Sequence, residues 1–325
     1  MASYDTNTTA AELVRDFSNE IKGKVILTTG VSPKGLGATF VTAVAKAQPA
    51  LLILAGRNVA KVQLTVDSIA SAYPDVKLRV LQLDLSSLAA VREAAATLNS
   101  WSDVPHIDVL VNNAGIMATD YSLSPEGFES QFATNHLSHF LFTNLIMDKI
   151  LASKAPRVIS VSSDTHRLHP IRWADYNFSN GETYHKWHAY GQSKTANALM
   201  ALSLAKKLGP RLRAYSVHPG VIQTELDDHL DWSVDYAVLQ AADRALGNKE
   251  GWANGFELKS VERGAATHVF ASFSPSLEGH NGAYLQDSQV ADPWVHTVKP
   301  WATSPVEAER LWKLSEELVG QSFAY

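Results

Sequence analysis

The stretch TTGVSPKGLG, Thr28–Gly37, closes a short apolar run and opens a longer segment with helical periodicity. Gly30 and Gly35 are spaced as in the first half of a phosphate loop, but that motif needs a lysine and a hydroxyl residue directly after its second glycine. Leu36 and Gly37 follow instead. A dinucleotide-binding turn fits better, because glycines after a strand let the backbone approach a pyrophosphate at a helix start. A plain strand-to-helix turn is the alternative.

Short apolar runs alternate with longer helical segments on both sides of this turn. The short runs predict strands at residues 25–29, 51–55, 78–83, 109–112, 157–162 and 212–217. The longer ones predict helices at residues 36–47, 60–72, 88–98, 127–151 and 189–208. Repeated βαβ units form a parallel sheet covered on both faces. The sequence therefore predicts a single α/β domain with a doubly wound parallel sheet (Rossmann type, three layers α/β/α) and a ligand at the carboxyl ends of its strands.

Further segments extend this pattern at both ends. Thr9 and Glu12 predict a capping box at the start of a helix over residues 9–21, and Ser304 and Glu307 predict another at the start of the last helix. A helix over 262–272 and a strand near 282–285 complete the sheet. The predicted divisions are an N-terminal helical extension at 1–23, one Rossmann-type domain at 24–290 with substrate-loop insertions at 164–189 and 225–258, and a C-terminal helical tail at 291–325.

The composition argues against several classes of function. The 325 residues carry a net charge of -5, and no basic run is interleaved with aromatic residues, so neither nucleic acid nor a membrane is an expected partner. The chain has no cysteine, which removes disulfides, thiolate zinc sites and a cysteine nucleophile. No apolar stretch approaches the roughly 18 residues of a membrane span, and no signal sequence is recognisable. The expected location is the cytoplasm.

The end of the second predicted strand indicates which dinucleotide is bound. A fold that prefers NAD places an acidic residue here to bind the ribose hydroxyls, but residues 55–58 include none. Arg57 instead offers a planar fork suited to a phosphate on that ribose, and Lys34 in the first turn adds a second positive charge. Both residues predict NADP(H) as the cofactor. The alternative for each is a solvated surface cation.

Five motifs in a fixed order carry a family resemblance. They are the first turn, Asn112-Asn113-Ala114-Gly115, Ser162-Ser163, Tyr190-Gly191-Gln192-Ser193-Lys194 and His218-Pro219-Gly220. Together they resemble the short-chain dehydrogenase/reductase family over roughly residues 24–285. Residues 134–140 and 215–220 resemble its retinol-dehydrogenase-like and WW-domain-oxidoreductase-like branch. The first turn and the tail resemble fungal members, which implies a fungal oxidoreductase of secondary metabolism. The first turn has four residues between its first two glycines, where the family usually has three.

These motifs bring together the groups that carbonyl reduction needs besides a hydride from the cofactor. Tyr190 is the predicted proton donor, but an ordinary phenol has a pKa near 10. Lys194 lies one helical turn further on, so its ammonium is expected to favour the phenolate. Ser163 is expected to hydrogen-bond the substrate oxygen as charge develops on it. The plainer alternatives are a half-buried aromatic with a solvated lysine, and a serine that caps a strand end.

The resemblance implies further roles. Asn135 matches the family asparagine that holds a water in a proton relay, and Lys194 would also grip the nicotinamide ribose. The predicted cofactor-binding residues are Gly30, Ser32, Lys34, Gly35, Leu36, Gly37, Arg57, Asp84, Leu85, Asn113, Ala114, Gly115, Tyr190, Lys194, Pro219, Gly220, Val221 and Thr224.

Aromatic residues gather in the two insertions. They are Trp173, Tyr176, Phe178, Tyr184 and Trp187 in the first, and Trp232, Tyr236, Trp252 and Phe256, with Leu239, in the second. They predict a roomy apolar pocket and a bulky lipophilic carbonyl or alcohol as substrate, although packing of the insertions onto the body explains them equally well. His166, His169, His185 and His188 form two His-x2-His pairs, but without cysteines or nearby acids no metal is expected.

The leading hypothesis is an NADP(H)-dependent oxidoreductase acting on a ketone, an aldehyde or a secondary alcohol. One alternative is a catalytically idle NADP-binding regulatory protein, against which the intact Tyr190 and Lys194 pair argues. The other is an NADP-dependent epimerase, dehydratase or double-bond reductase on the same fold. Family members are commonly dimers or tetramers, and the long C-terminal segments leave a monomer open.

Overall fold

The structure is a computed structural model, and it describes residues 4–248, 252, 255 and 257–325, so Phe256 lies outside the described residues. Within them a single sheet has the strand order β3-β2-β1-β4-β5-β6-β7-β8. The strands are β1 (Val25–Thr29), β2 (Leu51–Gly56), β3 (Leu78–Gln82), β4 (Val109–Asn112), β5 (Arg157–Val161), β6 (Arg213–His218), β7 (Tyr284–Gln286) and β8 (Gln289–Val290). Neighbouring strands are parallel except β7 and β8, which pair antiparallel. The order reverses between β1 and β4, which is the point where a doubly wound sheet binds its ligand.

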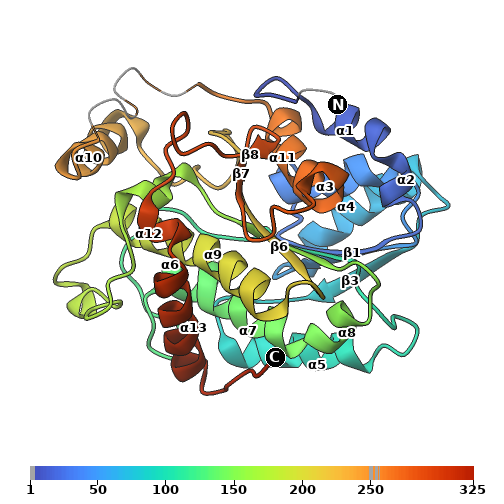
Figure 1. The fold of residues 1–325 in the computed structure, drawn as a ribbon, viewed down its shortest axis with the longest axis horizontal. Helices are drawn as coiled ribbons and strands as arrows, with labels where there is room; N and C mark the ends of the chain where they lie inside the picture. Colours follow the sequence, from blue (N-terminus) through green and yellow to red (C-terminus); the bar gives the residue numbers. More distant parts are fainter. Residues whose placement is uncertain (1–3, 249–251, 253–254, 256) are drawn as a thin grey trace.

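Helices cover both faces of the sheet (Figure 1). One layer contains α1 (Ala10–Asp16), α2 (Ser18–Ile21), α3 (Leu36–Ala45), α4 (Val59–Ala72) and α11 (Val261–Phe273). The opposite layer contains α5 (Leu88–Ser100), α7 (Ser138–Leu145), α8 (Met147–Leu151), α9 (Lys186–Leu208) and α13 (Pro305–Val319). Shorter or separate pieces are α6 (Ser130–Phe132), the π-helical turn η1 (Ala133–Leu137), α10 (Trp232–Ala245) and α12 (Pro300–Thr303). The predicted three-layer, doubly wound fold is confirmed.

The strands contribute alternate side chains to two cores. Along β1, Ile26 belongs to the core shared with α3 and α11, whereas Leu27 belongs to the core shared with α5 and α9. Both side chains are fully buried, and each such burial stabilises the fold by about 1.5–3 kcal/mol. Burial on both faces explains why the strands read as unbroken apolar runs rather than as alternating ones.

Side-chain caps fix where several helices begin. The predicted capping box of Thr9 and Glu12 is present with both of its hydrogen bonds. At α13 only half of the predicted box forms: the Glu307 backbone N–H donates to Ser304 Oγ, but the Glu307 carboxylate accepts a hydrogen bond of 2.8 Å from Trp173 Nε1. The second half of that prediction is therefore wrong, because a tertiary partner takes the carboxylate.

Two predicted helices are interrupted. The helix expected over 9–21 breaks at Phe17, which leaves helical geometry (φ -106°) and packs its ring against Tyr4 and Phe270. The helix expected over 127–151 begins only at α6, because Gly127 (φ +86°) forms a turn that pairs Leu123 with Glu129. Its next turn, η1, is π-helical, and this widened turn carries Asn135.

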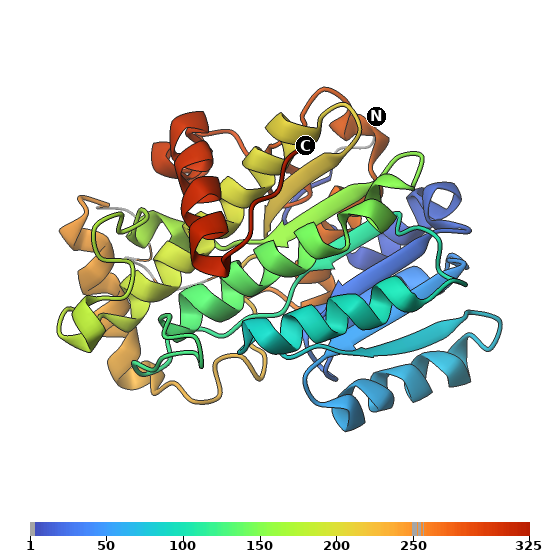
Figure 2. The ribbon, with the colours of Figure 1, turned by 90° about the horizontal axis from the view of Figure 1, so that it is seen from below.

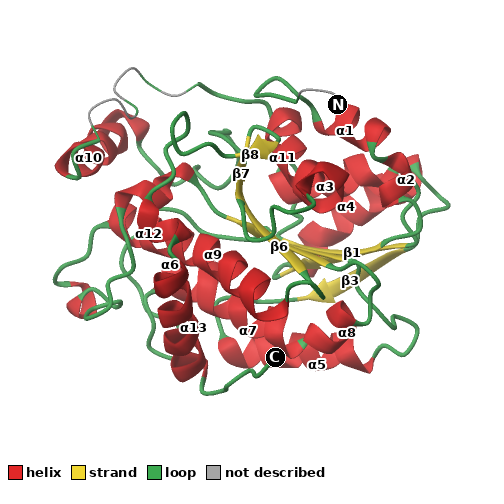
Figure 3. Cartoon of the chain, viewed as in Figure 1, coloured by secondary structure: helices red, strands yellow, loops and turns green. Residues whose placement is uncertain are grey.

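The unpredicted elements include helix α10, strand β8 and the short helix α12. Helix α10 lies within the insertion 225–258, begins at the N-cap Asp231, and stands apart from both helical layers (Figure 3). Strand β8 forms a hairpin with β7 through Asp287 and Ser288, both with positive φ.

In the described part of the chain no helix combines the length and apolarity that crossing a bilayer requires. The division at residues 23 and 290 stays a prediction.

The C-terminal segment packs over α7 and α9 (Figure 2). The Trp312 ring meets Phe140 of α7 edge-on, with ring centroids 4.9 Å apart, and Phe323 meets the same ring at 5.8 Å. Tyr325 donates a hydrogen bond of 2.6 Å to the Asn144 side chain. The chain thus covers the outer side of its own helical layer.

Candidate active site

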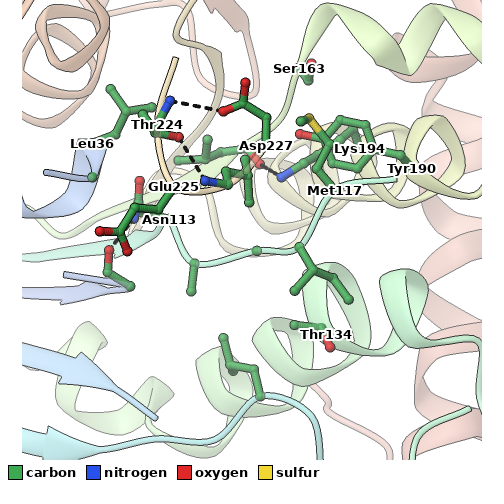
Figure 4. Close-up of a pocket in the computed structure, with 18 of the residues that line it drawn as sticks. Leu36, Asn113, Met117, Thr134, Ser163, Tyr190, Lys194, Thr224, Glu225 and Asp227 are labelled. Atoms are coloured by element: carbon green, nitrogen blue, oxygen red, sulfur yellow. Dashed lines mark hydrogen bonds between the residues drawn. The ribbon is translucent and has the colours of Figure 1, made fainter. Parts of the chain in front are cut away.

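A cavity of about 990 Å³ lies at the carboxyl ends of the strands (Figure 4). Most predicted site residues line it, from the glycine-rich turn at one end to Ser163, Tyr190 and Lys194 at the other. The predicted residues that do not line it are Lys34, Gly37 and Asn135. The sheet has therefore brought together residues that are up to about 190 positions apart in the chain, at the place where this fold binds ligands.

The glycines of the first turn are required by close backbone approach. Gly30 has φ +72°, and a Cβ there would lie 2.7 Å from Ala114 Cα. A Cβ on Gly37 would lie 2.4 Å from the Gly30 carbonyl oxygen, so Gly37 supports the turn from behind. Gly35 caps α3 without a side-chain hydrogen bond, which leaves the first amides of the helix available to an anion. These residues fit the pyrophosphate of a dinucleotide.

Asn113 holds this turn with its side chain. Its Nδ2 donates to the carbonyl oxygens of Thr29 (2.9 Å) and Gly30 (3.0 Å). The backbone N–H groups of Asn113 and Ala114 both donate to Thr29 Oγ1, each over 3.0 Å. The end of β4 is thereby fixed to the end of β1, and Asn113 contributes to the cavity as support for its wall.

The end of the cavity beside the glycine-rich turn and β2 is lined by two cations, Arg57 and Lys61, and by the carboxylates of Asp84 and Glu225. Arg57 lines it directly after β2 and is exposed, and Asp84 accepts hydrogen bonds from the Ser86 backbone and hydroxyl. Lys34 has a left-handed backbone (φ +65°) in the lengthened turn. Lys61, in the first turn of α4, does line the cavity and pairs with Glu225 at 3.3 Å. Sequence reasoning missed Lys61, although its place just after the strand was a usable signal.

The predicted catalytic groups come from α9 and from the end of β5. Tyr190 and Lys194 are 5% and 4% exposed. Lys194 Nζ donates to the Val161 carbonyl oxygen over 3.1 Å and lies 5.4 Å from the centroid of the Tyr190 ring. Ser163 Oγ accepts from the Thr165 backbone N–H over 3.1 Å. The ammonium is thus held over the phenol ring rather than released to solvent.

The direction of the Tyr190 pKa is a correction to the sequence-based expectation. Burial raises the pKa of Tyr190 above its usual value, the negative charge of Asp164 raises it further, and only a hydrogen bond with Ser163 lowers it. Burial also lowers the pKa of Lys194 to about 8. The expected acidic phenol is therefore not found in the protein by itself, because loss of water and the charge of Asp164 outweigh the hydrogen bond with Ser163.

Asp164 is a site residue that sequence reasoning missed. It lines the cavity directly after Ser163, its Oδ2 accepts a hydrogen bond of 3.1 Å from Trp252 Nε1, and its backbone N–H donates to His218 Nδ1 over 3.2 Å. An acidic residue next to the predicted catalytic serine was a signal in the sequence. Its contacts join the two insertions beside Tyr190.

Asn135 lies behind the cavity wall and is fully buried. Its Oδ1 accepts from the Ile116 backbone N–H over 2.8 Å, and its Nδ2 donates to the Ile116 carbonyl oxygen and to Ser193 Oγ, each over 2.9 Å. A Cβ on Gly115 would come within 3.0 Å of Asn135 Oδ1. The side chain thus joins η1 to the end of β4 and to α9, and its role in a proton relay stays a prediction.

The aromatic residues of the insertions divide into two groups. Those that line the cavity are Trp187, Trp232 and Trp252, with Leu239. Of the other aromatic residues that the structure describes, Trp173 donates a hydrogen bond to Glu307 and Tyr184 donates one to the Thr119 carbonyl oxygen, so both fix the first insertion to the rest of the protein. Fewer of the described aromatic residues therefore line the apolar end of the cavity than the sequence predicted.

The paired histidines are also accounted for by contacts within the protein. His166 lies behind Ser163 and bonds its carbonyl oxygen over 2.7 Å, while His185 stacks on His188 with centroids 4.2 Å apart and His188 meets His169 at 5.0 Å. No group of three potential metal ligands is present among the residues that the structure describes.

Comparison with known proteins identifies the family. The family model for short chain dehydrogenases matches residues 24–181. Oxidoreductase calI of Penicillium decumbens is 36% identical over 334 residues, which covers 97% of this chain and 93% of the relative. Retinol dehydrogenase 11 of Homo sapiens is 32% identical over 305 residues, which covers 93% and 87%. A crystal structure of an uncharacterized protein from Mycobacterium paratuberculosis aligns with a TM-score of 0.64 and 28% identity, covering 94% of this chain and 96% of the other.

The chain therefore belongs to the short-chain dehydrogenase/reductase family, whose members are oxidoreductases that generally depend on NAD(P). The predicted family is confirmed, with retinol dehydrogenases and fungal oxidoreductases among its relatives.

Proposed function

We propose that the protein is an NADP(H)-dependent oxidoreductase that reduces a ketone or aldehyde on a bulky lipophilic molecule, or oxidises the corresponding secondary alcohol. One observation carries the proposal: Ser163, Tyr190 and Lys194 line the same cavity as the glycine-rich turn. A substrate carbonyl beside Ser163, Tyr190 and Lys194 would meet a hydroxyl donor, a phenol and an ammonium. When hydride adds to the carbonyl carbon, these are the groups that the carbonyl oxygen requires, to stabilise its developing charge and to give it a proton.

The roles of these side chains follow from their surroundings. When bound, the nicotinamide supplies the hydride. Ser163 orients the substrate oxygen by a hydrogen bond. Tyr190 gives the proton, and its raised pKa keeps the phenol protonated at neutral pH, which is the form that a reduction consumes. Lys194, with a pKa lowered to about 8, is largely charged at neutral pH and stabilises the phenolate that remains after proton transfer.

The proposal of NADP(H) rather than NAD(H) rests on the cations at the end of the cavity beside the glycine-rich turn. Arg57 and Lys61 line that end, and residues 55–58 include no acid that would repel a phosphate on the ribose. A guanidinium can bind such a phosphate through two parallel hydrogen bonds.

Replacement of Arg57 by alanine is expected to raise the dissociation constant of NADPH by about 10- to 100-fold, because charge-assisted hydrogen bonds to the phosphate are lost. The dissociation constant of NADH should change less than about twofold. Quenching of tryptophan fluorescence measures both, since Trp187 and Trp252 line the cavity. Arg15→Ala, at an exposed arginine paired with Asp16, is the matched control. Equal loss of NADH and NADPH binding would contradict a role in phosphate recognition.

The proposed substrate class follows from the residues at the end of the cavity beside Tyr190. Trp187, Trp232 and Leu239 form an apolar cluster with Tyr190, and Met117 lines the cavity close to it. Broad aromatic surfaces next to a single polar corner favour a large apolar molecule with one reacting oxygen.

The proposed activity is tested by incubating the purified chain with NADPH and a panel of bulky ketones and aldehydes, and following the loss of NADPH absorbance. Retinaldehyde belongs in the panel because one relative is named a retinol dehydrogenase. We expect turnover with apolar carbonyls and little with small polar ones. NADPH binding without any turnover across the panel would instead favour a regulatory protein. Turnover that changes a double bond or a stereocentre, with no net carbonyl reduction, would favour a reductase, dehydratase or epimerase of the same fold.

A further inference from the structure

His139 on α7 is a buried histidine between the glycine-rich turn and Asn135. It is 1% exposed. Its Nε2 lies 3.0 Å from Thr29 Oγ1, at the end of β1. Its Nδ1 lies 3.1 Å from the backbone carbonyl oxygen of Asn135, in η1. One imidazole ring therefore contacts both the support of the proposed cofactor turn and the proposed catalytic asparagine.

The neighbouring donors determine which ring nitrogen carries the proton. Thr29 Oγ1 already accepts the backbone N–H groups of Asn113 and Ala114, and a hydroxyl oxygen has only two lone pairs. Its own hydrogen must therefore be donated, and His139 Nε2 is the acceptor in reach. A neutral imidazole that accepts at Nε2 carries its hydrogen at Nδ1. The Nδ1–H then donates to the Asn135 carbonyl oxygen, so both contacts are satisfied hydrogen bonds.

The surroundings keep this ring neutral. The pKa of His139 is lowered to about 4, because burial and the charge of Lys194 lower it by more than the hydrogen bond to the Asn135 carbonyl oxygen raises it. The other titratable neighbour is His136, whose pKa burial also lowers, to about 3. A proton on Nε2 would face the Thr29 hydroxyl, which has no free lone pair, and would add a positive charge near Lys194. One tautomer is thus favoured over the whole physiological range.

The backbone around Asn135 departs from regular α-helical geometry. In η1 the Ser138 N–H bonds the carbonyl oxygen of Ala133, five residues back, so the turn departs from the regular ladder of an α-helix. The Asn135 side chain is anchored by Ile116 and Ser193. The hydrogen bond from His139 to the Asn135 carbonyl oxygen fixes the backbone of the same residue. Both the side chain and the backbone of Asn135 are thereby held in place.

We propose that His139 is a positioning residue for the oxidoreductase reaction, which holds the cofactor turn through Nε2 and Thr29 and holds the catalytic asparagine through Nδ1 and the Asn135 carbonyl. The inference rests on the proposed function, and it takes up the expectation from the family resemblance that Asn135 takes part in the proton transfer of that reaction. The two ends of the ring serve different steps. Loss of the Nε2 contact weakens the turn that supports the cofactor, and loss of the Nδ1 contact misplaces the proton relay.

Two substitutions separate these contacts. In His139→Asn the side-chain amide can take the place of Nδ1 and still donate to the Asn135 carbonyl, but it does not reach Thr29. In His139→Gln the longer side chain can accept from Thr29 in place of Nε2, but it leaves that carbonyl without its donor. We expect His139→Asn to raise the dissociation constant of NADPH about fivefold with kcat within about twofold, the ratio expected for one hydrogen bond. His139→Gln should lower kcat about fivefold and leave NADPH binding within about twofold.

The matched control is His136→Asn, which removes another buried imidazole three residues away that bonds Ser315 rather than the site. It should change thermal stability but neither parameter. A direct readout that needs no activity is the ¹⁵N spectrum of the histidines, where the His139 signals should show an Nδ1–H tautomer that does not titrate between pH 5 and 9. An Nε2–H tautomer, or parallel changes of kcat and NADPH binding in both His139 variants, would overturn the proposal. If the wild type reduced no carbonyl, the proposed function would fail, while the spectrum and the NADPH titration would still decide the role of His139.

Discussion

Replacement of Tyr190 by phenylalanine is expected to lower kcat for carbonyl reduction by about 10²- to 10⁴-fold, the range that a positioned general acid contributes. The ring itself is buried against Lys194 and the apolar cluster, and phenylalanine keeps that packing while it loses only the hydroxyl. The dissociation constant of NADPH should therefore stay within about twofold. Steady-state kinetics and fluorescence titration measure the two quantities on the same preparation.

Tyr184→Phe is the matched control for this substitution. The Tyr184 hydroxyl donates to the Thr119 carbonyl oxygen and accepts from Gln131, so its loss should reduce the free energy of unfolding by about 0.5–1.5 kcal/mol per hydrogen bond and leave kcat unchanged. Wild-type kcat in Tyr190→Phe would rule out Tyr190 as the proton donor and favour the alternative functions.

The second large effect is expected from the charge of Lys194. Its pKa in the folded protein is lowered to about 8 by burial, so the ammonium is present below that pH and is lost above it. Because kcat/KM reports ionisations of the free enzyme, we expect kcat/KM for carbonyl reduction to fall as the pH rises through about 8. Lys194→Met should lower kcat/KM by about 10²-fold or more at pH 7 and remove this step from the pH profile.

The same ionisation gives a stability prediction of opposite sign. The unfolded lysine has its ordinary pKa, which is higher than the value in the folded state, so between about pH 8 and 10.5 the unfolded chain binds more protons than the folded one. Stability contributed by this site therefore rises with pH across that window. Thermal unfolding of wild type and Lys194→Met should show the wild type gaining stability relative to the variant over this range. A constant difference between the two proteins would mean that Lys194 keeps its ordinary pKa.

The parts of the fold that could be predicted are those that depend on local sequence patterns. The strand and helix order follows from apolar periodicity, and the glycines of the first turn follow from the backbone approach between Gly30 and Ala114. The spacing of Tyr190 and Lys194 on one helix also held. Helix α10 could not be predicted in the same way, because its apolar residues face a satellite cluster with Trp187 rather than the main core.

The site's electrostatics depended on tertiary structure. The direction of the Tyr190 pKa is set by burial and by Asp164, neither of which can be read from the spacing to Lys194. The sequence also could not show which aromatic residues line the cavity and which pack elsewhere. Trp187 and Trp173 lie in the same insertion, but Trp173 donates a hydrogen bond to Glu307 of the C-terminal helix. Lys34 and Lys61 illustrate the same point, because Lys61 lines the cavity and Lys34 does not.

The C-terminal segment has a consequence for how the molecule behaves in solution. Trp312, Phe323 and Tyr325 occupy the outer side of α7, and Ser203 of α9 donates to the Ala308 carbonyl oxygen. The apolar surface of these two helices is thereby buried within one chain. Contact between copies of the chain would therefore have to use surface other than the part of α7 and α9 that this segment covers.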